Sequence, residues 1–338
     1  MAGPRLGRIE RGSILLAALM VLCEVLGFTL LLSALREPLW KILGESGIGQ
    51  ILVWPAYGLI ILALAAVVNK FARGEGLRAL GLRCQGGFRG DVWTGVVAYA
   101  VLYVAALPFQ VVALADRARL TEPMMRQFGL SSMMQIITGG SLLALLMGFL
   151  TGAFHEEILF RGYYQGTGDR VLSPGAGFFI ALLPFTLGHY SSHPEWTMAQ
   201  VVATVLPGVA LGLLFGATGS LVAVMTLHTL SNWIDVYPVL VLVASRSRTA
   251  ALLTSGASAV AFLALVWIRR NREIRMLTQA ATTLFRGSPG RSIISGLLIG
   301  AVLLAIWPHR PAGVWAGLGG ACLIALAMAA KRLRGGHA

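Results

Sequence analysis

The sequence predicts an all-α fold, a polytopic transmembrane helical bundle of about 8–10 spans. Hydrophobic residues make up 57% of the chain and charged residues only 12%, which would leave a soluble fold of 338 residues with too little polar surface. Apolar runs long enough to cross about 30 Å of hydrocarbon, at about 1.5 Å per helical residue, recur along the whole chain. A bilayer is therefore the expected environment of most of the chain.

The candidate spans are apolar runs separated by short basic or Gly- and Pro-containing breaks. In order they cover residues 13–35, 47–69, 91–115, 132–154, 172–190, 198–217, 221–244, 249–268, 292–307 and 311–330. The first follows three arginines but is too long for the apolar core of a signal peptide, about 7–15 residues, so we expect it to remain as a span. No internal repeat divides the chain, and the simplest partition is one membrane domain over residues 1–338.

The basic residues predict the orientation of this bundle. Most of the 27 Lys and Arg residues fall on the side that also holds both termini. Cytoplasmic loops carry the excess of basic residues, so the N- and C-termini are expected in the cytoplasm. The net charge of +13 then reflects topology and attraction to anionic lipids, and nucleic acid is not expected as a partner because no soluble basic domain exists to bind it.

A basic segment over residues 269–291 combines arginines with a helical apolar pattern. Ile274, Leu277, Ala281 and Leu284 recur at helical spacing. This pattern predicts an amphipathic helix on the cytoplasmic surface of the membrane. An ordinary basic loop is the alternative interpretation.

The sixth span carries a glycine every four residues, at positions 208, 212 and 216. Small residues at this spacing let two membrane helices approach closely. We therefore expect this span to pack tightly against a neighbour.

The first polar motif within the spans reads His-Glu-Glu-Ile-Leu-Phe-Arg-Gly, over residues 155–162. Ionisable residues inside a bilayer are costly, so each one is a functional candidate. Glu157 and Arg161 are four apart on a helix and can pair, which neutralises one carboxylate. Glu156 lies on an adjacent face, where a carboxylate beside an apolar wall can act as a general base. Pairing of both glutamates with loop arginines at the membrane edge is the alternative.

Two later spans carry further polar groups. Phe185 is followed four residues later by His189, and His228 is followed four residues later by Asn232. An imidazole and a carboxamide on one helix face can donate hydrogen bonds to the same target. Asp235 follows as a further candidate partner or as the end of that helix. A lone buried histidine is more often a packed, satisfied residue, but polar sites in successive spans favour a shared site.

Taken together, these motifs resemble a known protease family. The pattern consists of Glu156-Glu157-x-x-x-Arg161, Phe185-x-x-x-His189 and His228-x-x-x-Asn232, in that order across neighbouring spans. It resembles the CAAX-protease and bacteriocin-processing family of intramembrane endopeptidases. The resemblance covers about residues 140–240, which we expect to form a catalytic core of that type.

The resemblance implies hydrolysis of a peptide bond in a membrane-associated protein or peptide, with C-terminal processing or sorting-type cleavage as the expected reaction. It gives Glu156 and His189 the activation of water, and it gives His228 and Asn232 the oxyanion site. It makes Glu157, Arg161 and Phe185 supporting residues. Arginine outnumbers lysine, and Ala and Gly are abundant, which favours a bacterial source and hence the bacterial cytoplasmic membrane.

The sequence leaves the participation of a metal open. The motif that begins at His155 starts like the zinc signature His-Glu-x-x-His, but Leu159 stands where the second ligand should be. Glu156, His189 and His228 could supply the three protein ligands of a catalytic zinc. We favour no metal.

Strict alternation of the spans raises a difficulty for this site. It places Glu156 near the cytoplasmic end of one span and His189 near the outer end of the next, too far apart to share a water molecule. The simplest solution is a fourth helix that starts near Gly140 and continues past Arg161.

Two functions of other classes remain possible from the sequence. Intramembrane Glu, His and Asn residues could form the relay of an ion- or proton-coupled transporter, although no inverted repeat is visible. A non-catalytic immunity or scaffold member of the same family is the other alternative.

Overall fold

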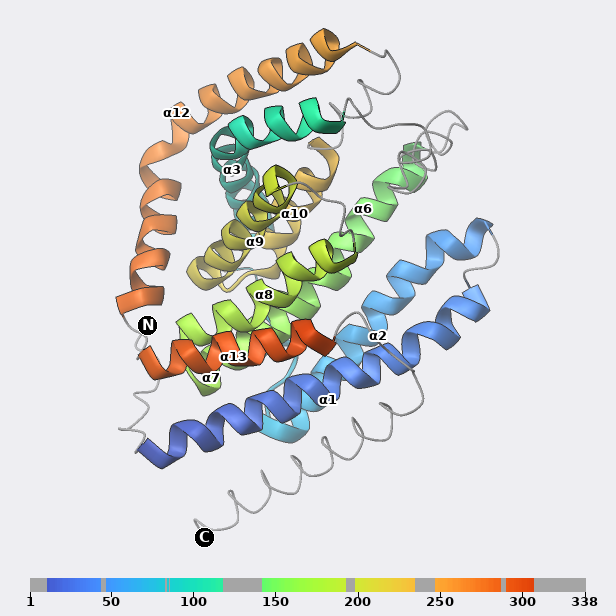
Figure 1. Ribbon diagram of the computed structural model, residues 1–338, viewed down its shortest axis with the longest axis vertical. Coiled ribbons are helices and arrows are strands. Elements are labelled where there is room, and N and C mark those ends of the chain that lie inside the picture. The colour runs from blue at the N-terminus through green and yellow to red at the C-terminus, as the bar shows by residue number, and fades with distance from the viewer. Residues whose placement is uncertain are drawn as a thin grey trace.

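The computed structural model describes residues 11–43, 47–82, 84, 86–117, 142–192, 198–234, 247–286 and 290–306. Across these residues every regular element is helical, and the helices pack as a bundle (Figure 1). The predicted all-α fold class is therefore confirmed. The predicted span 311–330 lies outside the described residues.

The elements alternate long helices with short connections. They are α1 (Arg11–Leu43), α2 (Gly47–Arg73), η1 (Leu77–Leu80), α3 (Gly87–Arg117), α6 (Leu142–Glu157), η2 (Ile158–Gln165), α7 (Gly166–Val171), α8 (Pro174–Ser192), α9 (Met198–Thr218), α10 (Leu221–Ile234), α12 (Arg248–Arg286) and α13 (Gly290–Ile306). Of these, η1 is a 3₁₀ turn and η2 is a π-helix.

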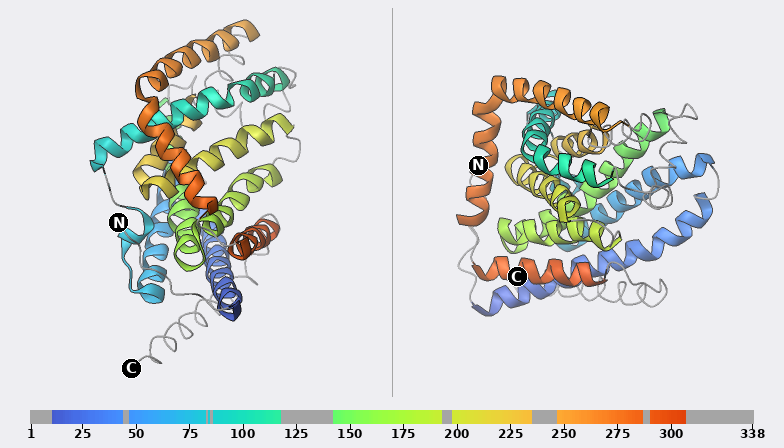
Figure 2. Two further views of the ribbon diagram at one scale, coloured as in Figure 1. Left: turned by 90° about the vertical axis from the view of Figure 1, so that its left-hand side faces the viewer. Right: turned by 45° about the horizontal axis from the view of Figure 1, so that its top comes forward.

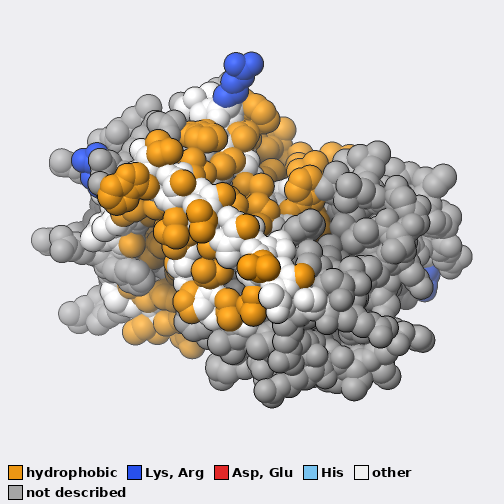
Figure 3. Space-filling model, turned by 90° about the horizontal axis from the view of Figure 1, so that it is seen from above, with side chains coloured by type: hydrophobic (Ala, Val, Ile, Leu, Met, Phe, Trp, Pro, Cys, Tyr) orange, Lys and Arg blue, Asp and Glu red, His pale blue; other side chains and the backbone are white. Residues whose placement is uncertain are grey.

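Three of the described helices are long and apolar enough to cross a membrane, over Ile14–Arg36, Gly87–Pro108 and Thr249–Ile268. Shorter apolar stretches occupy Pro55–Phe71, Pro174–Thr186, Val205–Thr218, Leu221–Ile234 and Ser292–Leu303. Large apolar side chains such as Leu253 and Val260 of α12 are exposed. Figure 3 shows one face covered mainly by apolar side chains, with Lys or Arg at its margins among the coloured residues. A surface of this kind suits lipid.

The fourth helix continues far beyond its predicted end at residue 154. α6 passes without a break into η2 and then α7, so that one continuous rod runs from Leu142 to Val171. All eight residues of η2 are buried. The charged motif therefore lies inside a helix that continues past Arg161, which confirms the longer helix that we expected.

Helices from several parts of the chain pack against this rod (Figures 1 and 2). α2 and α10 pack against α6, and α8 packs against η2 and α7. α8 also lies between α9 and α13. The polar motifs on α6, α8 and α10 are thereby brought to one region of the bundle.

The glycines of α9 allow the predicted close packing. A Cβ at Gly208 would collide with Thr186 Cγ2, and one at Gly212 would lie 2.8 Å from the Phe178 ring, both on α8. α9 ends at Thr218, and the positive φ of 58° at the next residue, Gly219, permits the tight turn into α10.

The basic segment belongs to the long helix α12, which changes direction along its length (Figure 1). Leu284 near its end is 4% exposed and packs against Phe178 and Leu182 of α8. Ile274 is 40% exposed. Part of the apolar face therefore covers the protein, and contact of residues 269–291 with the membrane surface stays a prediction.

Candidate functional site

Glu157 is the central acceptor of the site. It is the last residue of α6 and is fully buried. Its Oε1 accepts a hydrogen bond from Arg161 Nη1 at 3.1 Å, the pair that the spacing of four predicted, and lies 2.7 Å from His228 Nδ1 on α10. One carboxylate oxygen thus ties the α6–η2 rod to α10.

Arg161 is 1% exposed, and its charge is compensated on three sides. Besides Glu157, its Nη2 donates to the carbonyl oxygen of Gly208 at 3.2 Å, and its guanidinium carbon lies 4.1 Å from the centre of the Phe185 ring. A cation over an aromatic face is attracted by the ring quadrupole. This set of contacts fixes the rod against α8 and α9.

The π-helical geometry matches the rod to the glycines of α9. Arg161 bonds the carbonyl of Gly208, and Gln165 Nε2 donates to the carbonyl of Gly212 at 2.9 Å. Donors four residues apart on η2 therefore meet carbonyls four residues apart on α9. π-Helical turns are rare and often occur at functional sites.

His228 presents its two ring nitrogens to two carboxylates. Nδ1 lies against Glu157, while Nε2 is 3.7 Å from Glu156 Oε2. Its ring stands nearly perpendicular to that of Phe185, at 5.7 Å between centroids. Phe185 thus contacts both Arg161 and His228 and forms an apolar wall beside the polar groups.

Glu156 reaches a second histidine on its other side. Its Oε1 is 3.9 Å from Nε2 of His155, whose Nδ1 lies 3.0 Å from the backbone oxygen of Thr151. The side chain of Glu156 keeps 25% of its surface exposed. It therefore combines contact with two imidazoles and access to the medium.

The other predicted residues lie on the expected helices. Asn232 is half-buried on α10, one turn after His228. His189 lies in α8, one turn after Phe185, but its side chain is outside the described residues, as is Asp235. The structure thus brings Glu156, Glu157, Arg161, Phe185 and His228 together, and the roles of His189 and Asn232 stay predictions.

The donor set can be compared with a zinc site. Within the described part of the chain, no group of three His, Cys, Asp or Glu side chains is placed to hold a metal ion. Glu156 and His228 lie close enough to share an ion, and Glu157 on Nδ1 is the kind of partner that orients a metal-binding imidazole. The position of the third predicted ligand cannot be compared with a zinc site, because the side chain of His189 is outside the described residues. Zinc therefore stays a hypothesis.

A second cluster of buried charge was missed by the sequence reasoning. Glu24 of α1 forms an ion pair with Arg73 of α2 at 2.5 Å, and it accepts a hydrogen bond from Tyr163 of η2 at 3.0 Å. Arg73 also donates to Asn69 at 2.7 Å. A carboxylate within the first span, as Glu24 is, already indicates a buried polar partner. Sequence spacing could not identify this partner, because Arg73 lies 49 residues away.

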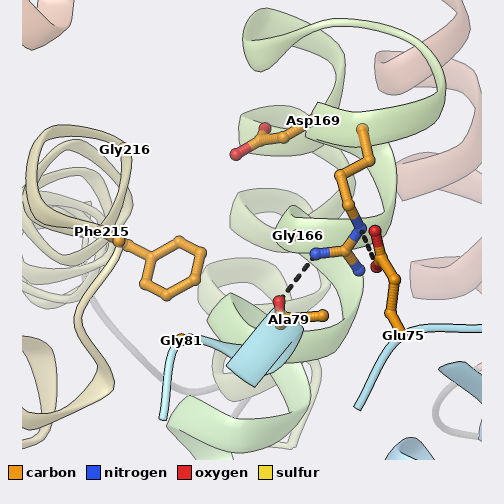
Figure 4. Close-up of a pocket in the computed structure, with 9 residues that line it drawn as sticks. Glu75, Ala79, Gly81, Gly166, Asp169, Phe215 and Gly216 are labelled. Atoms are coloured by element: carbon orange, nitrogen blue, oxygen red, sulfur yellow. Dashed lines mark hydrogen bonds and ion pairs between the residues drawn. The ribbon is translucent and has the colours of Figure 1, made fainter. Parts of the chain in front are cut away.

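A cavity of about 340 Å³ lies farther along the rod, at α7 (Figure 4). In it Arg170 Nη1 donates to the carbonyl oxygen of Ala79 at 2.7 Å, and its Nε is 3.5 Å from Glu75 Oε2. None of the predicted site residues lines this cavity. Its cation and carboxylate contact each other, so the arrangement fastens the segment after α2 to α7.

The comparison with protein families agrees with the motifs. Residues 138–234 match the family model described as Type II CAAX prenyl endopeptidase Rce1-like. The resemblance to the CAAX-protease family is confirmed. The match covers under a third of the chain and contains every predicted site residue. No curated protein and no solved structure matched the chain.

The family match and the apolar helices support two coarse statements. The chain is similar to membrane proteases, which supports peptidase activity on a membrane-associated protein substrate. The apolar helices support an integral membrane protein.

Proposed function

We propose that this protein is an intramembrane endopeptidase that hydrolyses a peptide bond in a membrane-associated protein or peptide. The observation that carries the proposal is the pairing of Glu156 with His228. Nε2 of His228 lies 3.7 Å from Glu156 Oε2, while Glu157 holds Nδ1 on the far side of the ring. A carboxylate and an imidazole oriented by a second carboxylate form the kind of constellation that acts on a water molecule and a carbonyl group.

Glu156 acts as the general base. Its Oε2 and His228 Nε2 are too far apart for a direct hydrogen bond, yet one water molecule placed to the side of the line between them can contact both. Glu156 takes a proton from this water, assisted by His189, and the oxygen attacks the scissile carbonyl carbon. The side chain keeps 25% of its surface exposed, whereas Oε2 itself is buried, so a water molecule at Oε2 would be enclosed by the protein.

His228 and Asn232 hold the oxyanion of the tetrahedral intermediate. With Nδ1–H donated to Glu157, the protonated ring of His228 also presents Nε2–H to the oxyanion. Asn232, one turn along α10, supplies an amide N–H. A preorganised donor of this kind contributes about 10²–10³ in kcat.

Cleavage takes place in the bacterial cytoplasmic membrane, with both termini of the enzyme in the cytoplasm. The substrate is a membrane-anchored protein or peptide that is processed towards its C-terminus, and anionic lipids surround the basic loops. These assignments rest on the basic-residue pattern and on the family match.

The substitution Glu156→Gln tests the proposal, because it keeps the size of the side chain and removes the base. Cells that carry the parent, this variant or no protein are compared by mapping the new C-termini of their membrane proteins. We expect the parent to generate termini that are absent from both other samples. Glu75→Gln, which neutralises a carboxylate at the α7 cavity, is the matched control and should behave as the parent.

Two other results would contradict the proposal, and each would indicate a different function. Termini that are unchanged by Glu156→Gln, together with a loss of ion or solute flux, would indicate a transporter. Unchanged termini and unchanged flux would indicate a non-catalytic scaffold.

A further inference from the structure

Glu156 lies between two imidazoles, and the family pattern gives a role to only one of them. On one side His228 Nε2 is 3.7 Å from Oε2, and on the other His155 Nε2 is 3.9 Å from Oε1. The two histidines come from different helices, α10 and α6. Both nevertheless present the same ring nitrogen to the same carboxylate.

The hydrogen bond at Nδ1 defines the state of each ring. His155 Nδ1 lies 3.0 Å from the carbonyl oxygen of Thr151, which can only accept, so Nδ1 carries the proton. In the neutral ring Nε2 is then a proton acceptor that faces Glu156. His228 differs in the partner of its Nδ1, which is the carboxylate of Glu157 and not a backbone carbonyl oxygen. The two imidazoles are therefore suited to different tasks.

Packing holds the His155 ring in this position. The side chain is 11% exposed and lies beside the ring of Tyr57 on α2, with centroids 5.8 Å apart. Gly58 brings the backbone of α2 close, since a Cβ at that position would meet the His155 Cβ at 3.3 Å and the Phe154 ring at 2.7 Å. A confined ring with one nitrogen fixed has little freedom to turn Nε2 away from Glu156.

We propose that His155 is a further catalytic residue, which passes the proton taken up by Glu156 to the nitrogen of the leaving amine. The inference rests on the proposed function of the same site. It assigns the base, the oxyanion donors and the leaving-group acid to separate side chains.

The proton and electron balance of the step is as follows. Glu156 accepts a proton as the water oxygen bonds to the carbonyl carbon, and the carbonyl π pair moves to the oxyanion held by His228 and Asn232. The proton then passes from Glu156 to Nε2 of His155. As the C=O bond re-forms, the C–N bond breaks and its electron pair on nitrogen takes the proton from His155. The new acid loses its own proton to solvent, so that both protons of the water are accounted for.

The separation of 3.9 Å exceeds a hydrogen bond, so a small movement of either side chain completes the transfer from Glu156 to His155. Catalytic hydrogen bonds are often long without substrate and shorten when it binds.

The test compares an amide and an ester of the same sequence. The protein, in lipid nanodiscs, first selects a cleaved sequence from an acyl-anchored, internally quenched peptide library. The matching depsipeptide carries an ester at the same bond. An alkoxide leaves with less help from an acid than an amine does, so loss of the leaving-group acid should affect the amide far more.

His155→Asn is the first variant, because its amide N–H can still reach the Thr151 carbonyl. We expect kcat for the amide to fall by about 10²–10⁴, the range for a general acid, with a much smaller fall for the ester and little change in KM. His155→Ala is the second variant, and added imidazole should restore part of its amide cleavage. An equal fall for amide and ester, or no fall at all, would overturn the inference, as would a folded His155→Ala that imidazole does not restore.

Glu156→Gln, measured in the same assay, separates the two proposals. If the parent cleaves no peptide, the proposed function itself fails, and if Glu156→Gln cleaves both substrates as the parent does, Glu156 is not the general base. If Glu156→Gln is inactive on both while His155→Asn matches the parent, only the role of His155 fails.

Discussion

Two clusters of buried charge lie in this bundle, and they are built differently. Around Glu24, each charged group contacts its partner directly, at 2.5 Å to Arg73 and 3.0 Å to the Tyr163 hydroxyl. Around Glu156, the Nε2 atoms of His228 and His155 lie farther from the carboxylate oxygens, at 3.7 and 3.9 Å. The side chain of Glu24 is 6% exposed, whereas that of Glu156 is 25% exposed.

The difference distinguishes a structural ion pair from the candidate catalytic site. A carboxylate in direct contact with a cation has its charge neutralised and leaves no room for a reactant, so Glu24 joins α1, α2 and η2. Glu156 keeps a larger exposed fraction than Glu24, so it is the carboxylate of the two that a substrate can approach. Glu157 combines both roles, since it pairs directly with Arg161 and in doing so orients His228. A buried charge in a membrane helix is thus a functional candidate only until its partners are known.

The largest expected effect contrasts the two carboxylates. Glu156→Gln should reduce kcat by about 10²–10⁴, the range for loss of a general base, with a nearly unchanged melting temperature. Glu24→Gln should instead lower the melting temperature, because it leaves Arg73 without its carboxylate, while the folded fraction keeps its kcat. Peptide cleavage and thermal unfolding of both variants check this. If Glu24→Gln is inactive but melts as the parent does, Glu24 also takes part in catalysis, and the distinction between the two carboxylates is wrong.

The next effect concerns the oxyanion site. Asn232→Ala should reduce kcat by about 10²–10³ and leave KM nearly unchanged, as loss of a donor that acts only in the transition state does. Steady-state kinetics on a cleaved peptide measure both constants. A rise in KM at constant kcat would make Asn232 a substrate-binding residue instead.

The two arginines provide a matched pair for stability. Arg161→Ala and Arg73→Ala each remove the guanidinium partner of a buried carboxylate, at a cost of up to about 3–5 kcal/mol if fully buried. Only Arg161→Ala should also lower the activity of the protein that remains folded, because Glu157 then loses the partner that orients it towards His228. If Arg161→Ala is inactive and melts as the parent does, Arg161 contacts the substrate.

The smallest expected effect is that of a chelator, which should leave peptide cleavage by the parent unchanged. Metal analysis of the purified parent and of His189→Ala, run beside the cleavage assay, measures the same property directly. Stoichiometric zinc in the parent that is lost in the variant would replace the metal-free roles of Glu156 and His228 by those of ligands.

Local spacing predicted part of this site correctly. The contact between Glu157 and Arg161 follows from a helical repeat within five residues. The approach of His228 to Glu156 followed from the order of motifs across spans, a resemblance rather than a calculation. The all-α class followed from composition alone.

Other features depend on tertiary contacts that spacing does not contain. The apolar run of the fourth span ends at residue 154, but the helix continues because Glu157 and Arg161 neutralise each other inside the bundle. The π-helical form of residues 158–165 depends on the fit of Arg161 and Gln165 to the carbonyls of α9. The approach of His155 to Glu156 was overlooked because adjacent residues on a helix diverge, and the rotamers that bring them together are set by α2 and α10.

The contacts of α9 have a consequence for how that helix tolerates mutation. Gly208 and Gly212 accept hydrogen bonds through backbone oxygens, which no substitution can delete. Saturation mutagenesis at these two positions should therefore rank replacements by side-chain volume, with polarity of little importance, since the Thr186 methyl and the Phe178 ring occupy the space that a Cβ would need. Positions 161 and 165 on the donor side should show the opposite profile, sensitive to chemistry even at constant size. A variant library read out for folded protein would thus distinguish the acceptor helix from the donor helix.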